Sequence, residues 1–516
     1  MMTELVAAAA VPGPWCPHPS SGGFHRISGH YDPSGPIQMG KVWHVFPDGG
    51  RGGWAHYTST DLLRWKQEEN STHLANGDTG SISVTEHGTI GLFPHLAAPH
   101  YGLDRQLPLA SDLNEWLQPA HVVDSPRPHV GVGFRDPARA VQVPGGDGTW
   151  YVGVGSGFGG DNNKTALPGV GTGCLAWMKA ADGRLQNFTF AGCLLTNNHT
   201  TGHIDPGTLE WKDASMPVAF FECPDVFPLG DARTTVAIAS FYNWHKGAYF
   251  TNEWFVGAID PSESATFQTH SRGLLDYGQL YAARTGASGD GPAGRQAPNG
   301  RRVLFGATGW HNPPGMDSSC DPQIHLIPRD LGIDKVTGGL SIAPIPELAT
   351  LRVGAATVGD EKAGAVSITT GARLQLQLNC TGSFETSGGD SDVVGFEVLA
   401  TSDRMAFTRV GYNLTSRRMF VDHRSSSRTV TSEIVQTTAA GLVVQPKETS
   451  LVLDVLVDGA LLEVFGNRRA VISSFVTELM REGTNVTAPA ERVTFLVAPP
   501  VKGVACQWEA HKLMGL

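Results

Sequence analysis

The chain has 516 residues, which is too long for one ordinary hydrophobic core and predicts two or three domains. Its composition is that of a globular protein, and its 63 glycines and 33 prolines suit many short strands joined by turns. The formal net charge of −11 argues against a nucleic-acid or anionic-membrane partner, and no apolar run approaches the length of a transmembrane helix.

Residues 1–20 are interpreted as an N-terminal segment outside the first domain. Residues 5–11 are apolar and alanine-rich, but Glu4 lies where a signal peptide would carry positive charge, so a signal peptide is not clearly present. Sequons nevertheless favour secretion, because Asn-x-Ser/Thr becomes a surface glycan only in a secretory pathway. Seven occur, at Asn70, Asn163, Asn187, Asn198, Asn379, Asn413 and Asn485.

Strand signals dominate the first two thirds of the chain, and no long amphipathic helix competes with them. Short β-branched or aromatic runs, bounded by Gly, Pro or Asp, occur at 41–46, 149–154, 235–241 and 302–306. Many short strands at this spacing predict a sandwich, a barrel or a propeller, and the pattern alone does not choose among them. We assign this first domain to residues 21–345.

A second all-β region is expected after a linker at 346–364. Strand-like runs, several of them with alternating apolar and polar residues, occur at 365–368, 374–378, 395–399 and 451–457. Such alternation fits a β-sandwich in which each sheet buries one face. Residues 365–516 are therefore predicted to form a C-terminal β-sandwich, with an exposed loop at 387–392.

The seven cysteines are too few for a disulfide scaffold. Cys174 and Cys193 are one possible pair, but the sequence leaves the pairing open. No Cys-x-x-Cys or His-x-x-x-His spacing suggests zinc, so we expect neither a metal nor another cofactor.

Three carboxylates lie in short motifs: Asp32 in residues 30–36 (HYDPSGP), Asp136 in 133–137 (GFRDP) and Glu222 in 221–225 (FECPD). Each motif alone is typical of a turn. Breaking a glycosidic bond with retained stereochemistry needs a carboxylate nucleophile and a protonated carboxyl group about 5 Å away. A third acid can bind sugar hydroxyls and stabilise the positive transition state. The wide spacing predicts that distant segments bring the three acids together.

This ordered set resembles glycoside hydrolase family 32, which comprises invertases, inulinases, fructan exohydrolases and fructosyltransferases. The resemblance covers most of the chain, since further similar stretches lie at 54–65, 107–116, 275–283, 328–331, 344–348 and 457–465. It implies an all-β protein with a five-bladed β-propeller catalytic domain followed by a β-sandwich. The carboxylates would then meet where strands reach the central channel.

The resemblance also implies the role of each acid. Asp32 would attack the anomeric carbon of a β-fructofuranosyl unit, and Glu222 would protonate the departing oxygen and then activate water. Asp136 would hold ring hydroxyls, and Arg135 would bind substrate and keep Asp136 ionised. This division requires Glu222 to stay protonated while Asp32 is ionised. Cys223, beside the acid, is interpreted as a packed small hydrophobe rather than a tuning group.

Three more substrate-binding candidates lie near departures from the family pattern. Trp54 is either an aromatic wall of the pocket or a core tryptophan, and Ser81 resembles a serine that touches fructose. Asp48 stands where the family has a glutamine, and a short glycine-rich loop follows it at 49–53. Tyr31 and Ser34 replace two asparagines that usually flank the nucleophile. We therefore expect the bond-breaking chemistry to be kept and the rim of the pocket to have changed.

Three functions remain open at this point. The first is a retaining β-fructofuranosidase that acts on sucrose or small fructans. The second is a fructosyltransferase, in which a sugar acceptor replaces water at the same covalent intermediate. The third is a catalytically silent carbohydrate-binding protein, against which the retention of three acids counts. The expected partner is a small sugar, with no nucleic acid and no membrane, and the oligomeric state is left open.

Overall fold

The computed structural model describes residues 27, 32–48, 53–68, 78–95, 101–126, 132–143, 145–157, 173–197, 203–204, 211–212, 220–231, 233–242, 251–260, 266–287, 300–308, 324–360, 373–382, 384, 393–401, 405–426, 436–439, 443–476, 492–497 and 504–516. These residues are nearly all strand and turn, which confirms the all-β class. The described part of the chain contains no helix that is both long and apolar enough to cross a membrane.

Five antiparallel sheets form the N-terminal domain within the described ranges, which is the number that a five-bladed propeller requires. The first contains β1 (Pro33–Met39), β2 (Val42–Pro47), β3 (Tyr57–Ser59) and β4 (Lys66–Gln67). The second contains β5 (Ser81–Thr85), β6 (Gly88–His95), β7 (Gly102–Gln106) and β8 (Ala120–Asp124).

The third sheet contains β9 (Val132–Arg135), β10 (Val141–Gln142), β11 (Trp150–Gly157), β12 (Gly173–Ala180) and β13 (Thr189–Asn197). The fourth contains β16 (Phe220–Pro228), β17 (Thr235–Tyr242), β18 (Thr251–Asp260) and β19 (Thr266–Leu274). The fifth contains β20 (Leu280–Ala287), β21 (Arg302–Thr308), β22 (Arg329–Ile333) and β23 (Leu340–Pro344). A separate two-stranded sheet pairs β14 (His203–Ile204) with β15 (Trp211–Lys212).

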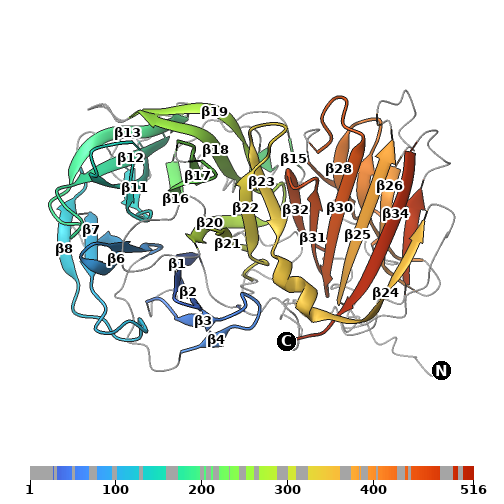
Figure 1. The fold of residues 1–516 in the computed structure, drawn as a ribbon, viewed down its shortest axis with the longest axis horizontal. Coiled ribbons are helices and arrows are strands. Elements are labelled where there is room, and N and C mark those ends of the chain that lie inside the picture. The colour runs from blue at the N-terminus through green and yellow to red at the C-terminus, as the bar shows by residue number, and fades with distance from the viewer. Residues whose placement is uncertain are drawn as a thin grey trace, which may run out of the picture.

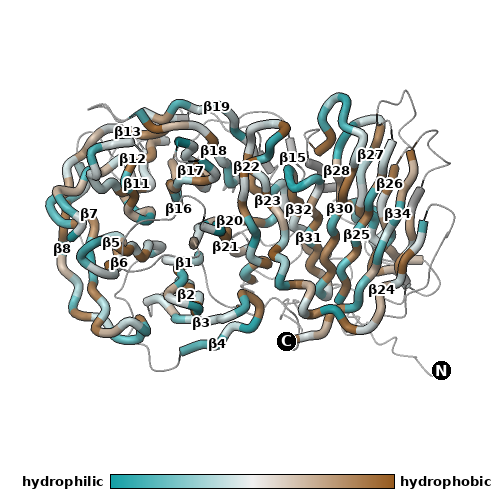
Figure 2. The backbone as a smooth tube through the Cα atoms, in the orientation of Figure 1, coloured by the Kyte–Doolittle hydropathy of each residue, from teal (hydrophilic) through white to brown (hydrophobic). Residues whose placement is uncertain are grey.

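The five sheets surround a common centre, as Figure 1 shows on its left side. The strand β1 contacts both β5 and β20, and β16 contacts both β11 and β20. The contact between β20 and β1 closes the ring, because these strands come from the last and the first sheet. Hydrophobic clusters fill the spaces between neighbouring sheets, for example Ile37, Ile82 and Phe93 between the first two. The outermost strand β4 is hydrophilic (Figure 2).

The C-terminal domain is a sandwich of two antiparallel sheets. One has the order β24 (Arg352–Asp360), β34 (Val504–Leu513), β25 (Arg373–Gly382), β30 (Ser450–Asp458), β31 (Leu461–Gly466) and β32 (Ala470–Phe475). The other has the order β29 (Gln436–Ala439), β28 (Arg418–Asp422), β27 (Thr408–Asn413), β26 (Val393–Ala400) and β33 (Arg492–Val497). Their inner faces share one large apolar core, to which Leu376, Phe396 and Val455 contribute.

Within the stretch predicted as a linker, 346–364, the described residues 346–360 contain regular structure. A 3₁₀ helix, η2 (Pro346–Leu351), is followed directly by β24, which pairs with β34 at the edge of the first sandwich sheet. The sandwich sheet therefore includes residues that the sequence analysis placed before it. The strand expected at 365–368 and the loop expected at 387–392 lie outside the described residues.

Two disulfides hold strands together among the described cysteines. Cys174 and Cys193 join β12 to β13 in the third sheet, which is the pair that the sequence left as one possibility. Cys380 and Cys506 join β25 to β34 in the sandwich, and no local pattern predicts this pair because 126 residues separate them.

The two domains pack through a continuous apolar cluster and through backbone hydrogen bonds. Propeller residues such as Leu275 and Val303 pack with Phe465 and Val471 of the sandwich. The backbone of residues 277–279 hydrogen-bonds to β32, from Tyr277 N to Val471 O and from Gln279 N to Ser473 O. In Figure 1 the sandwich accordingly lies directly beside β22 and β23.

Candidate active site

The three predicted carboxylates meet at the centre of the ring. Asp32 immediately precedes β1, Asp136 immediately follows β9, and Glu222 lies in β16. A fourth strand, β20, contributes Tyr281. The site is therefore assembled from four different sheets, which explains the wide spacing of its acids along the chain.

Local backbone irregularities aim these side chains. The pairing of β16 with β17 shifts register between Glu222 and Asp225, and the pairing of β20 with β21 shifts between Tyr281 and Arg284. Next to these shifts, Cys223 and Ala282 adopt positive φ values of 45° and 51°, and Asp136 has a φ of 56°. Non-glycine residues rarely adopt this conformation, and such strain is typical of functional sites.

Asp32 is held by donors from two other sheets. Thr79 Oγ1 donates to Asp32 Oδ2 at 2.8 Å, and the Cys223 thiol lies 3.5 Å from the same oxygen. Burial raises the pKa of Asp32 to about 7, with further increases from Asp136 and Asp48, while the hydrogen bonds from Thr79 and Cys223 oppose the rise. Both donors favour the ionised form, which a nucleophile needs.

Asp136 accepts from the backbone of the next motif. Cys223 N donates to Asp136 Oδ2 at 3.0 Å, and the Cys223 thiol lies 3.7 Å from that oxygen. Burial raises the pKa of Asp136 and Glu222 adds to the increase, although Arg135 and Arg284 oppose it. Arg284 Nη2 also donates to the main-chain oxygen of Asp136 at 3.1 Å, so it holds the backbone at the site.

Cys223 contacts both Asp32 and Asp136, and it packs in a small buried cluster with Tyr281 and Ala282. Burial raises the pKa of its thiol well above the usual value, and the two aspartates raise it further. The thiol therefore stays protonated and serves as a donor rather than as a nucleophile. The expected packing role holds, but the contacts to both acids were not foreseen.

Glu222 lies between a cation and a phenol. Arg135 Nη2 donates to Glu222 Oε1, and the Tyr281 hydroxyl donates to Glu222 Oε2. Burial raises the pKa of Glu222, and the carboxylates of Asp32 and Asp78 raise it further against the opposing effect of Arg135. The raised pKa favours a carboxyl group that carries a proton, as a general acid must.

Arg135 links the acids to one another. Its guanidinium contacts Glu222, its Nε lies 3.8 Å from Asp136 Oδ2, and its Cζ lies 4.5 Å from the centre of the Phe220 ring. Burial lowers the pKa of Arg135, but Glu222 and Asp136 outweigh this effect and raise it. Arg135 therefore remains a fixed positive charge among the carboxylates.

Asp78 is a further acid that sequence analysis missed. It precedes Thr79, and its main-chain oxygen accepts from Trp54 Nε1 at 3.3 Å. The surrounding protein raises the pKa of Asp78 by removing water, and Asp136 raises it further, while Arg135 opposes the change. Asp78 keeps part of its surface exposed. No sequence motif marks Asp78, because only its proximity to the three acids in the folded chain identifies it.

The remaining candidates occupy different surroundings. Trp54 is only 2% exposed and packs against Phe46 and Phe93, which favours the core alternative, so its contact with sugar stays a prediction. Ser81 is buried and donates to Ala138 O at 2.9 Å, so its contact with sugar stays a prediction. Asp48 is half-buried, and its main-chain N–H donates to Asp32 O at 3.0 Å.

The departures from the family pattern are only partly visible. Ser34 is buried, and its hydroxyl accepts from Gly80 N at 3.0 Å, so it joins the first sheet to the second. Tyr31 and residues 49–52 of the glycine-rich loop lie outside the described residues.

The three acids together are suited to proton transfer. Carboxyl groups that share a buried site titrate as a set, because each ionisation raises the cost of the next. Here Asp32, Asp136 and Glu222 all have raised pKa values. Such a set can hold a proton on one member and negative charge on another, which is the requirement for acid and nucleophilic catalysis at one centre.

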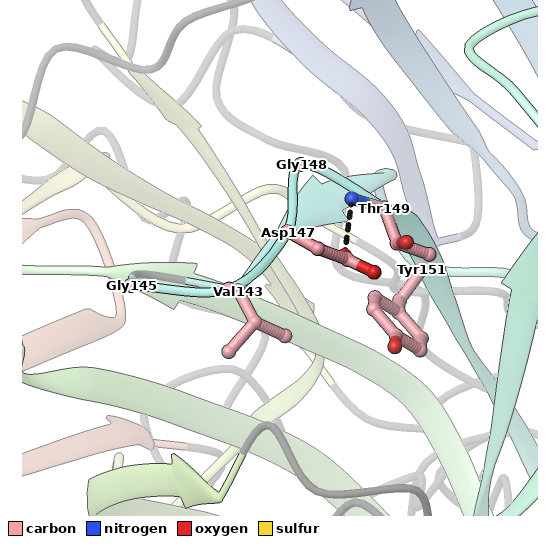
Figure 3. Close-up of a pocket in the computed structure, with 7 residues that line it drawn as sticks. Val143, Gly145, Asp147, Gly148, Thr149 and Tyr151 are labelled. Carbon is pink, nitrogen blue, oxygen red and sulfur yellow. Dashed lines mark hydrogen bonds between the residues drawn. The ribbon is translucent and has the colours of Figure 1, made fainter.

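A separate pocket of about 400 Å³ lies at the turn between β10 and β11 (Figure 3). Its lining consists of Val143, residues 145–149 and Tyr151. The turn is fixed by Asp147 Oδ1, which accepts from Thr149 N at 2.9 Å. None of the three acids lines this pocket, so it is not the candidate active site.

Comparison with known proteins places the whole arrangement in one family. The family model "Glycosyl hydrolases family 32 N-terminal domain" matches residues 30–344, and "Glycosyl hydrolases family 32 C terminal" matches residues 347–491. A levanase of Bacillus sp. (strain L7) is 24% identical over 86% of this chain and 47% of its own length. A sucrose-6-phosphate hydrolase of Klebsiella pneumoniae is 24% identical over 62% of this chain and 65% of its own.

The chain thus spans about half to two thirds of the length of these two relatives. Among solved structures, fructan 1-exohydrolase IIa from Cichorium intybus has a TM-score of 0.69 at 18% identity, and the match covers 96% of this chain and 98% of that one. This likeness confirms the propeller-plus-sandwich fold.

Proposed function

The chain belongs to glycoside hydrolase family 32, and we propose that it is a retaining β-fructofuranosidase. It would hydrolyse terminal β-D-fructofuranosyl units of sucrose or small fructans through a covalent fructosyl-enzyme intermediate. The observation that carries the proposal is the meeting of Asp32, Asp136 and Glu222 at one centre, around Arg135.

In the first step the Asp32 carboxylate attacks the anomeric carbon. The bond from that carbon to the leaving oxygen breaks, and Glu222 transfers its proton to this oxygen. In the second step the Glu222 carboxylate takes a proton from water while the water oxygen attacks the anomeric carbon. The ester bond to Asp32 then breaks, which releases fructose and returns both carboxyl groups to their initial states.

Asp136 and Arg135 bind rather than react. The Asp136 carboxylate accepts hydrogen bonds from sugar hydroxyls and faces the positive charge that develops on the ring. The Arg135 guanidinium favours the ionised form of Asp136 and donates to substrate oxygens. Tyr281 orients the Glu222 carboxyl group through its hydroxyl.

Charge at the site favours an uncharged sugar over a phosphorylated one. Among the described residues, the carboxyl group of Asp48 raises the pKa of Asp32, and that of Asp78 raises the pKa of Glu222. A phosphate group beside these carboxylates would experience repulsion in a poorly solvated site. Because one relative is a sucrose-6-phosphate hydrolase, the kcat/KM values for sucrose and for sucrose 6-phosphate should be compared.

The experiment compares sucrose, sucrose 6-phosphate, 1-kestose, inulin and levan, with released sugars separated by chromatography. We expect free fructose from the neutral substrates and a lower kcat/KM for sucrose 6-phosphate. Growing oligosaccharides at high sucrose would indicate a fructosyltransferase instead, and no release from any substrate would indicate a silent binding protein. An activated fluorinated fructosyl donor should label Asp32, and a label on Asp136 would contradict the assigned nucleophile.

The proposed setting is a secretory pathway. Two disulfides and seven sequons support it, and Asn187 and Asn379 are exposed. Removal of N-glycans by an amidase from protein made in a eukaryotic host should lower its mass. An unchanged mass would contradict glycosylation.

A further inference from the structure

A cluster of two histidines and two aspartates lies in the second sheet and shares no residue with the carboxylate site. His95 is the last residue of β6, Asp104 lies in β7, and His121 and Asp124 lie in β8. These three strands are adjacent and hydrogen-bonded to one another, and Figure 1 shows β6, β7 and β8 on the side of the propeller away from the sandwich.

The Asp104 carboxylate lies between the two imidazoles. Its Oδ2 is 2.9 Å from His95 Nδ1, and its Oδ1 is 3.0 Å from His121 Nδ1. The two imidazole rings also contact each other edge to face, with centroids 4.8 Å apart. One donor atom from each of His95, Asp104 and His121 lies within 4.8 Å of the others.

The contacts of His121 suit either an imidazolium ion between two carboxylates or a bound metal ion. Its Nδ1 faces Asp104 and its Nε2 faces Asp124 Oδ1, each at 3.0 Å. An ionised carboxylate only accepts, so both contacts are hydrogen bonds only when His121 carries two ring protons and a positive charge. A neutral imidazole satisfies one carboxylate and leaves a lone pair directed at the other. A metal ion bound to that lone pair and to Asp104 removes the conflict.

We propose that His95, Asp104 and His121 bind a divalent transition-metal ion, with zinc as the reference ion. Imidazole nitrogen and carboxylate oxygen are the ligands that zinc, cobalt and nickel share. Asp124 does not bind the ion but accepts a hydrogen bond from His121 Nε2, which fixes the orientation of the imidazole. Such a carboxylate behind a ligating histidine is a common arrangement in metal sites.

The geometry requires only a small adjustment. Zinc–nitrogen and zinc–oxygen bonds of about 2.0–2.2 Å place tetrahedral donor atoms about 3.4 Å apart, so the widest separation of 4.8 Å must close by roughly 1.4 Å. His95 and His121 are 29% and 39% exposed at their side chains, so the imidazoles have room to rotate. Three protein ligands leave a coordination position for water, and the bound ion would join β6, β7 and β8.

The spacing along the chain hides this site from sequence analysis. His95, Asp104 and His121 are 9 and 17 residues apart and lie on three strands, so no short His-x-x-x-His pattern arises. The sequence expectation of no metal rested on such patterns alone.

The test uses the full chain after metal removal, with Zn²⁺ binding measured by titration calorimetry and by equilibrium dialysis. We expect the His95→Gln variant to bind one equivalent of Zn²⁺ fewer than the unchanged protein, and His121→Gln to do the same. Asp124→Asn should keep the stoichiometry and weaken the affinity about 10–100-fold. Co²⁺ should give the visible absorption of a low-coordinate site, and that band should be absent in His95→Gln.

His87→Gln is the matched control, because His87 lies beside Glu86 at 3.8 Å in the turn that leads into β6 but outside the cluster. This variant should bind Zn²⁺ as the unchanged protein does. Circular dichroism of every variant checks folding. Equal Zn²⁺ stoichiometry in the unchanged protein, His95→Gln and His121→Gln would overturn the proposal and leave an ion-pair cluster in its place. None of these readouts depends on hydrolytic activity, so the result is independent of the proposed function.

Discussion

Arg329 of the propeller and Glu463 of the sandwich form a buried ion pair, with Arg329 Nη2 2.9 Å from Glu463 Oε2. The same nitrogen donates to Asp276 Oδ2 at 2.7 Å and to Ser473 Oγ at 2.8 Å. One guanidinium therefore lies between two carboxylates that come from different domains. This pair makes the junction selective, because any shift of one domain against the other would leave charges unpaired.

Replacement of this arginine should destabilise both domains together. Arg329→Met leaves Asp276 and Glu463 buried without their cation, and breaking a buried pair in this way costs about 3–5 kcal/mol. We expect a clear fall in the midpoint of thermal unfolding. Arg184→Met is the control, since Arg184 and Asp182 pair at the surface with both side chains exposed, and such pairs contribute about 0–1 kcal/mol. Equal stability of the two variants would contradict the role of the junction.

A chain that ends near Pro346 should aggregate. It would expose the apolar residues around Leu275 and Val303 that pack against the sandwich, and exposed patches of this kind promote association. Size-exclusion chromatography with light scattering measures the outcome. Recovery of a monomeric, fully active fragment would show that the sandwich is dispensable.

Glu222→Gln should retain the fold and sugar binding and lose most turnover of sucrose. General acid catalysis typically contributes 10²–10⁴-fold, and an amide has no acidic proton to give. Steady-state kinetics on sucrose test this, with the thermal midpoint as a control for folding. A rate within about tenfold of the unchanged protein would remove Glu222 from the acid role.

Asp78→Asn should move the alkaline limb of the pH–rate profile to lower pH. The Asp78 carboxylate raises the pKa of Glu222, so removing its charge lowers that pKa and the acid loses its proton at lower pH. The profile of kcat/KM on sucrose measures the shift. Asp147→Asn serves as the control, because Asp147 lies in the turn of the separate pocket (Figure 3). An unmoved limb in Asp78→Asn would mean that Asp78 does not act on Glu222.

Two buried histidines should make the fold sensitive to acid. His44 Nδ1 lies 2.9 Å from His56 Nε2, and burial lowers the pKa of both to about 4 from 6.5, with each affected in addition by its neighbours. Because the unfolded chain takes up these protons at a higher pH than the folded chain does, the stability contributed by the two neutral histidines is fully present above pH 6.5. It is lost as the pH falls from 6.5 toward 4. A shift of about 2.5 units corresponds to roughly 3 kcal/mol per histidine.

Thermal unfolding of His44→Gln between pH 7 and pH 4 checks this effect. The variant should lose less stability over that interval than the unchanged protein does, whatever its stability at pH 7. His511→Gln, which changes a histidine that contacts Glu509 in β34, should follow the unchanged protein. A parallel pH dependence in all three would place the acid sensitivity elsewhere.

Sequence analysis found the strands better than it found the contacts between them. The runs at 235–241 and 302–306 correspond to β17 and β21 within two residues at either end, because short β-branched or aromatic runs bounded by Gly, Pro or Asp are typical of strands. The stretch 346–364 is predicted as a linker because the first strand-like run of the second region is placed at 365–368. In the structure β24 lies at a sheet edge with most residues at least partly exposed.

Local sequence likewise identified only part of the candidate active site. The motifs located Asp32, Asp136 and Glu222, since family resemblance acts on local sequence. Asp78 and the hydroxyl of Tyr281 reach the acids only through the closure of the ring, and no local pattern encodes that proximity. The sequence left two alternatives open for Trp54, and its burial in the structure favours the core.

The place of β34 in the sandwich has a consequence for biosynthesis. This strand is the last of those described, yet it lies between β24 and β25 in the interior of its sheet and is tied to β25 by Cys380 and Cys506. On the ribosome, β24 and β25 emerge well over a hundred residues before β34. They cannot complete their sheet until β34, which lies between them, has been synthesised. The propeller face that packs on the sandwich is likewise not fully covered until the sandwich is complete. A nascent chain stalled before residue 504 should therefore still depend on chaperones, however completely its earlier sheets have formed.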